Sequence, residues 1–116
     1  MFAQTIWQMM EGPMYNFGIW SEGPALKDHL AQCGVADRPF WITETGWDSN
    51  RLGEAKQADF YQKFLAGIEA RTWVQNVFFY EIQDDPTRPD GVRQGLIDEG
   101  YRKKASFNVL RSALVG

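Results

Sequence analysis

Glu44 has the residue type and the position of a catalytic carboxylate. It directly follows a run of aromatic and β-branched residues at positions 40–43, and Gly46 comes two positions after it. Such a run is typical of a buried parallel strand, and α/β folds keep their catalytic groups at the carboxyl ends of these strands. We therefore expect the Glu44 carboxylate to lie at the carboxyl end of a buried strand.

Four blocks of the sequence carry a family pattern. Residues 41–47 read Trp-Ile-Thr-Glu-Thr-Gly-Trp, and residues 77–85 end in Tyr-Glu-Ile-Gln-Asp-Asp. Residues 95–98 and 103–107 follow in order as Gly-Leu-Ile-Asp and Lys-Lys-Ala-Ser-Phe. In this order the blocks resemble the C-terminal part of retaining glycoside hydrolases built on (β/α)8 barrels, a clan of cellulase-like and xylosidase-like enzymes. The chain departs from that pattern at Gln94, where phenylalanine is usual, and at Lys104, where proline is usual.

The resemblance implies that Glu44 is the nucleophile of a retaining glycosidase. A retaining mechanism needs a second carboxyl group, about 5 to 5.5 Å from the first, which protonates the leaving oxygen. In this family the acid/base glutamate follows an asparagine, and no Asn-Glu pair occurs in the chain. We therefore expect a glycosidase-like chain that does not hydrolyse glycosides by itself, because its acid comes from another segment or chain.

The same resemblance suggests substrate-binding side chains near Glu44. Trp47, in the loop after the strand, is the expected platform for a sugar ring, whereas Trp41 is expected in the core. Tyr80 and Glu81 come late in the next strand, where alternation lets only one of them face the barrel interior and orient the nucleophile. Glu81 is a candidate for the missing acid, although ordinary ion pairing is the interpretation we favour.

The elements expected to hold these residues alternate between helix and strand. Apolar spacing predicts helices at 24–33, 53–71 and 103–114, strands at 40–43 and 77–82, and a polar loop at 48–51. In the N-terminal segment 1–20, residues 2–10 fit a short amphipathic helix and residues 14–20 a further strand. With strand–helix units over 24–114, we predict one α/β domain over 1–116: a partial (β/α)8 barrel of two to three parallel strands with flanking helices.

The length of the chain bears on its assembly. A complete barrel needs about 250 residues, and this sequence has 116. Two or three strands leave sheet edges unpaired and an apolar face half covered, and unprotected edges pair with other chains. We therefore predict a homo-oligomer in which part-barrels complete one another, with the Met- and aromatic-rich N-terminal segment covering exposed surface.

Composition excludes several classes of partner. The chain has 12 basic against 15 acidic residues and a net charge of −3, so it offers no basic stripe for nucleic acid. No apolar run approaches the roughly 20 residues that span a bilayer.

The sequence predicts neither a metal site nor a cofactor site. The acidic loop at 84–91 has two prolines and does not match EF-hand spacing, and His29 has no second histidine at ligand spacing. One cysteine excludes an internal disulfide. We expect no signal peptide, because the N-terminal residues show no basic-then-apolar pattern, although relatives in the resembled family are often exported.

Three functions from different classes follow from this sequence. The first is the nucleophile-bearing part of a retaining glycosidase, with Glu44 attacking the sugar. The second is a non-catalytic carbohydrate-binding protein that uses Trp47 and its neighbours. The third is a structural protein derived from a glycosidase, whose surface serves self-assembly and binds no sugar.

Overall fold

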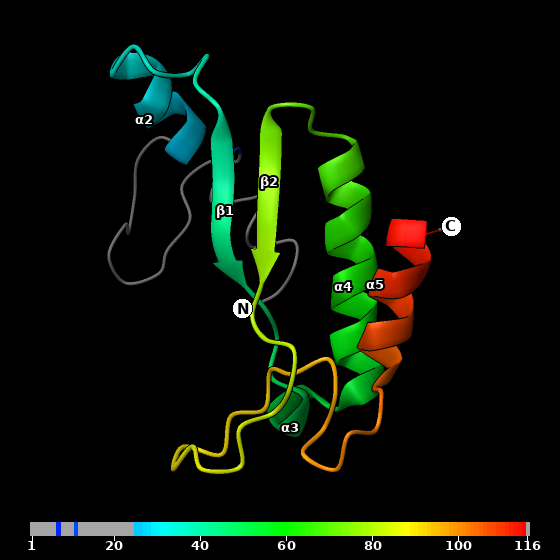
Figure 1. Cartoon of the computed structure of the whole chain (residues 1–116). Helices are drawn as coiled ribbons and strands as arrows, with labels where there is room; N and C mark the ends of the chain where they lie inside the picture. Colours follow the sequence, from blue (N-terminus) through cyan, green and yellow to red (C-terminus); the bar gives the residue numbers. More distant parts are fainter. Residues whose placement is uncertain (1–6, 8–10, 12–24, 116) are drawn as a thin grey trace.

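A sheet of two parallel strands forms the centre of the protein (Figure 1). The computed structural model describes residues 7, 11 and 25–115. Within it, β1 (Phe40–Thr45) pairs with β2 (Val74–Phe79), so that Phe40 lies opposite Val74 and Thr45 opposite Phe79. The α/β class and the parallel pairing predicted from the sequence are confirmed, with two strands in the described part of the chain.

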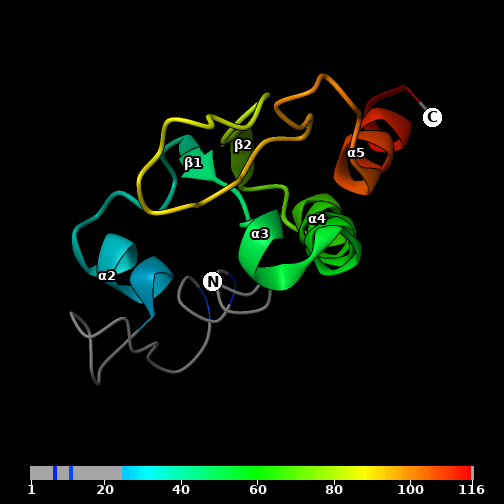
Figure 2. The same cartoon turned by 90° about the horizontal axis from the view of Figure 1, so that it is seen from below.

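Four helices accompany the sheet in the described part of the chain. They are α2 (Leu26–Gln32), α3 (Ser49–Leu52), α4 (Glu54–Glu69) and α5 (Ala105–Val115). Helix α4 connects β1 to β2 and lies beside them, and α5 packs against α4 (Figures 1 and 2). The two strands and their crossover helix therefore form a single layered unit.

Two sequence predictions differ from the structure in detail. The expected polar loop at 48–51 contains α3, which begins there because the Asp48 side chain caps it by accepting a hydrogen bond from the Asn50 amide. Strand β2 begins three residues before the predicted start at Val77 and ends at Phe79. The helix expected at 2–10, apart from Trp7, and the strand expected at 14–20 lie outside the described residues.

The core between the sheet and α4 is aromatic. Phe79 of β2 contacts the rings of Tyr61 and Phe64 from α4, with centroid distances of 5.2 and 5.9 Å. Both helix rings are fully buried, which is why the apolar stripe of α4 faces the strands. Such rings bury large apolar areas, so this layer is the main source of stability in the unit.

The opposite face of the sheet carries aromatic side chains that remain exposed. Trp41 of β1 and Phe78 of β2 are each 51% exposed, and their ring centroids lie 6.0 Å apart. The assignment of Trp41 to the core is therefore wrong for this structure, because no described element covers that face. None of the described helices is long and apolar enough to cross a bilayer.

Candidate active site at the carboxyl ends of the strands

Glu44 lies at the carboxyl end of β1, as the sequence predicts. Its side chain is exposed and forms no hydrogen bond or ion pair with the described residues. The next residue, Thr45, accepts a hydrogen bond of 2.7 Å from the backbone amide of Tyr80, which directly follows β2. The carboxylate thus lies where the ends of both strands meet.

Gly46 explains how the two strand ends come so close. A Cβ atom at this position would collide with the backbone carbonyl of Tyr80. Only a glycine allows the chain leaving β1 to pass the chain leaving β2 at backbone distance. The glycine two positions after Glu44 is therefore a packing requirement of the site.

Tyr80 and Glu81 occupy the neighbouring strand end. Tyr80 is 36% exposed, and a cis peptide bond joins the two residues. The expected ion pair of Glu81 is absent among the described residues, and its Oε1 atom is buried without a hydrogen-bond partner among them. A buried carboxylate oxygen without a donor is costly, so this end of the sheet holds an unsatisfied acceptor.

Trp47 lies in the core and offers no ring face to a sugar. Its side chain is 1% exposed and contacts the rings of Phe60, Tyr61 and Phe64, with centroid distances of 4.9 to 6.3 Å. The expected stacking role of Trp47 is therefore corrected, because this ring packs against the aromatic side chains of α4. The exposed ring is Trp41, on the open face of the sheet.

A buried polar cluster under the loops was not anticipated. Lys104 forms an ion pair with Asp84 at 2.8 Å, and the two side chains are only 2% and 6% exposed. The Lys104 ammonium also donates to Ser49 Oγ at 2.8 Å. Both charged residues lie within the family-like blocks of the sequence, so the signal was present, but spacing alone did not pair residues twenty positions apart.

A second charged group lies nearer the surface, at the start of α4. The Arg102 guanidinium bonds both the Glu54 carboxylate and the Asp98 carboxylate. The hydrogen bond from Arg102 holds the pKa of Glu54 below its ordinary value. The pKa of Asp98 is also lowered, mainly by the backbone amide of Arg102. Both carboxylates are therefore held in their charged forms.

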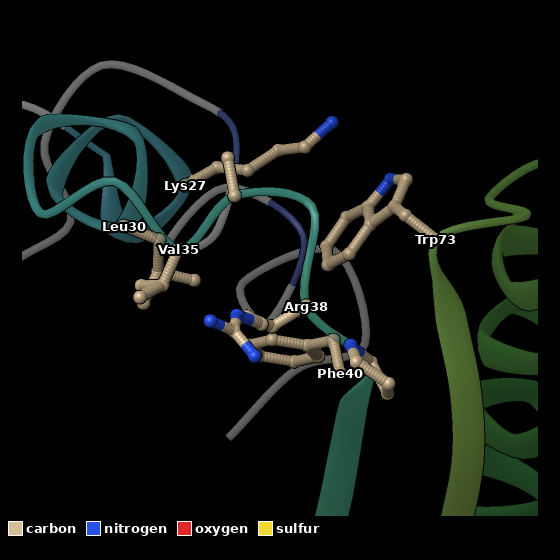
Figure 3. Close-up of a pocket in the computed structure, with 8 residues that line it drawn as sticks. Lys27, Leu30, Val35, Arg38, Phe40 and Trp73 are labelled. Atoms are coloured by element: carbon tan, nitrogen blue, oxygen red, sulfur yellow. The ribbon is translucent and has the colours of Figure 1, made fainter.

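A small pocket lies at the other end of the sheet. Its volume is about 110 Å³, and Phe40 and Trp73, at the amino ends of the strands, form one wall (Figure 3). Lys27 extends over the Trp73 ring at 4.6 Å from its centroid, while the Arg38 side chain points away from Lys27. The two cations do not converge, and the pocket is separate from the strand ends that carry Glu44.

The chain is similar in sequence and in fold to parts of known glycosidases. No family model matches the chain. A glucan 1,3-beta-glucosidase from Candida albicans is 29% identical over 94 residues, which span 74% of this chain and 30% of that protein. A Bifidobacterium dentium beta-glucuronidase superposes with a TM-score of 0.60 at 23% identity, covering 78% of this chain and 17% of that one. For GH5_18 from Streptomyces cattleya the TM-score is 0.58 at 20% identity, with coverages of 67% and 20%.

The chain is glycoside hydrolase-like. The solved structures share its fold, and the curated relative resembles it in sequence over a limited part of its own length. Because this glycoside hydrolase-like chain spans less than a third of each of these relatives, their whole activities do not transfer to it directly.

Proposed function

We propose that this chain carries the nucleophile of a retaining glycosidase, with Glu44 as the attacking carboxylate. The observation that supports this most directly is the position of Glu44: an exposed carboxylate at the carboxyl end of a parallel strand, beside a second strand end. Parallel α/β folds build their active sites at this end of the sheet. The glycosidase relatives supply the reaction class.

The proposed reaction is a double displacement. The Glu44 carboxylate attacks the anomeric carbon, the bond from that carbon to the leaving oxygen breaks, and a carboxylic acid protonates the leaving oxygen. Water, deprotonated by the same second carboxyl group, then cleaves the glycosyl ester and restores Glu44. Tyr80 and Glu81, at the adjoining strand end, orient the nucleophile or the sugar.

The second carboxyl group comes from outside the described residues in this proposal. The open face that carries Trp41 and Phe78 has no covering element in the described part of the chain, and a second copy or a further segment is the partner that fits an apolar sheet face. We propose a homo-oligomer in which such a partner covers this face and brings the acid toward Glu44.

The test uses a sugar whose departure needs no acid. A dinitrophenyl 2-fluoro-β-glucoside releases dinitrophenolate unprotonated, and its fluorine slows hydrolysis of the glycosyl ester, so the ester accumulates on the nucleophile. A β-glucoside is chosen because the curated relative is a glucan 1,3-beta-glucosidase. The expected result is a mass increase of one fluoroglucosyl group on the peptide that contains Glu44.

Matched variants decide the assignment. Glu44→Gln should abolish the labelling with the far-UV circular dichroism unchanged, because an amide does not form the ester. Glu81→Gln should still be labelled at Glu44, because Glu81 is not the attacking group. Absence of label on the wild-type chain, or label that persists in Glu44→Gln, would overturn the proposal.

Non-catalytic sugar binding is the second candidate, and the open aromatic face favours it. The exposed rings of Trp41 and Phe78 present flat apolar surfaces to solvent, and sugar C–H faces pack against such surfaces. This function predicts saturable quenching of tryptophan fluorescence by β-glucan oligosaccharides, lost in Trp41→Ala and kept in Glu44→Gln. Loss of binding in Glu44→Gln would contradict it.

A further inference from the structure

The ion pair between Lys104 and Asp84 joins parts of the chain that are distant in sequence. The Lys104 ammonium lies 2.8 Å from both carboxylate oxygens of Asp84. Lys104 precedes α5, whereas Asp84 lies in the loop that follows β2. Since both side chains are almost fully buried, neither charge can be hydrated if the other is removed.

On one side, the pair holds the loop that follows β1. Lys104 donates to Ser49 Oγ, and Ser49 in turn donates to the carbonyl of Arg93 through its hydroxyl and through its amide, at 3.1 and 2.8 Å. Ser49 comes only five positions after Glu44. The ammonium therefore fixes the chain that leaves the nucleophile strand.

On the other side, the pair holds a return segment, residues 92–97, which folds back along the end of β2. Asp84 Oδ1 accepts a hydrogen bond of 2.8 Å from the amide of Gly95. A Cβ atom at Gly95 would overlap the backbone at Gln83 and Asp84, so only glycine allows this approach.

The return segment, in turn, forms hydrogen bonds with both the amide and the carbonyl of Glu81. The amide of Glu81 donates to the carbonyl of Gln94 at 3.1 Å, and the carbonyl of Glu81 accepts from the amide of Leu96 at 3.0 Å. One chain of contacts thus runs from Lys104 through Asp84 and the return segment to Glu81. A second chain runs from Lys104 to Ser49.

We propose that Lys104 and Asp84 are positioning residues, which hold the strand ends carrying Glu44 and Glu81 in a fixed relation through the loops that follow. This inference rests on the proposed function of Glu44. Neither residue touches the sugar. They act by binding two loops, one from each side of the site, to the buried Lys104 ammonium.

The experiment compares three variants of the full chain. Lys104→Met removes the cation and leaves Asp84 buried without a counter-ion. The double variant Asp84→Asn/Lys104→Met removes both charges, while the asparagine carbonyl can still accept from Gly95. Lys103→Met, an exposed neighbour, is the matched control. For each variant, the labelling rate at Glu44 and the hydrogen exchange of individual amides are measured.

We expect Lys104→Met to lower the labelling rate by about tenfold or more, with exchange of the Glu81 and Leu96 amides accelerated by a similar factor and exchange in β1 and β2 unchanged. The double variant should recover most of both losses, since replacing both partners of a buried pair is far better tolerated than removing one. Lys103→Met should match the wild type in both measurements.

The outcomes separate the positioning role from a general structural one. In one outcome, Lys104→Met is labelled at the wild-type rate while its Glu81 amide exchanges faster. That result would show that the ion pair stabilises a loop without positioning the nucleophile, and it would overturn the inference. If the wild-type chain is not labelled at all, the proposed function fails. Hydrogen exchange then tests the inference without the labelling. If the Glu81 amide is as protected in Lys104→Met as in the wild type, the ion pair does not hold the strand end, and the inference is overturned.

Discussion

Gly46 shows how a single residue sets the geometry of the site. Its missing side chain lets the backbone after β1 pass the carbonyl of Tyr80. The next residue, Trp47, lies in the core against α4. A glycine in this position therefore lets the two strand ends come together.

Gly46→Ala should destabilise the protein by about 1 to 3 kcal/mol, the usual cost of forcing an extra methyl group into a filled space. The measurement is the free energy of unfolding from urea denaturation. Gly100→Ala is the control, because a Cβ atom there would meet nothing closer than 3.4 Å. Equal stability of both variants would show that the backbone at Tyr80 yields easily.

Predictions for single residues succeeded where neighbouring residues in the sequence determine the position of the side chain. The strand-forming run before Glu44 and the glycine after it were enough to place that carboxylate at a strand end. Trp41 and Trp47 were assigned the wrong environments, because burial depends on which face of the sheet is covered. That information lies in the packing of α4 and in the absence of a described layer on the other face.

Among the elements, α4 connects the core to the loops through one buried side chain. Gln57 Nε2 donates to the carbonyls of Trp47 and Gly95 at 2.9 and 3.2 Å, and Gln57 Oε1 accepts from Ser106 of α5. A single glutamine thus satisfies groups from both loops and from a second helix. Helix α4 is thereby fixed in rotation as well as in position.

Gln57→Met should cost about 1 to 3 kcal/mol of unfolding free energy, because it leaves buried polar groups without partners in a space that methionine fills. Thermal and urea unfolding measure the change. Gln62→Met is the control on the same helix, since Gln62 is exposed. If the two variants are equally stable, water replaces the glutamine at no cost.

Element boundaries were predicted less well than element types. The long apolar stripe of α4 was recognised over 53–71 and observed as Glu54–Glu69. For β2, the apolar run at 77–82 suggested a later strand, but pairing with β1 begins at Val74 and the chain leaves the ladder at Tyr80. The apolar pattern did not reveal the first half of the strand, because Gln75 and Asn76 are polar, and both are exposed in the described part of the chain.

For the whole molecule, we expect the free energy of unfolding to fall in acid, because Glu54 and Asp98 both bind Arg102 as charged carboxylates. The pKa values of Glu54 and Asp98 are lower in the folded chain than their ordinary values of 4.5 and 3.8. The folded state therefore binds fewer protons, so this stabilisation is present above the ordinary pKa values and is lost as pH falls through the folded ones.

Arg102→Met should flatten the fall of the melting temperature between about pH 5 and pH 3 by a few degrees, because Glu54 loses the side-chain hydrogen bond that lowers its pKa, whereas Asp98 keeps its bond from the backbone amide of residue 102. Scanning calorimetry over that pH range measures the effect. Arg51→Met, another exposed arginine, is the control. Parallel pH profiles for Arg102→Met and the wild type would contradict the assignment.

The open aromatic face makes a separate prediction about assembly. We expect the sedimentation coefficient of the chain to rise with concentration in the micromolar range, because pairing buries Trp41 and Phe78. Trp41→Ser should shift the equilibrium toward the monomer. Leu114→Ser removes an even more exposed apolar group, on α5, and should leave the association unchanged. A compact wild-type monomer at these concentrations would contradict a homo-oligomer.

The long sequence separation of the Lys104 contacts has a consequence for the order of events in folding. The unit β1–α4–β2 closes within residues 40–79, whereas Lys104 lies beyond this unit and meets Ser49 across 55 positions. Contacts between distant residues cost more chain entropy to close. During synthesis, the strands and their helix can assemble while Lys104 is still inside the ribosome. The relation between Glu44 and Glu81 then becomes fixed only later, when Lys104 has left the ribosome and α5 docks.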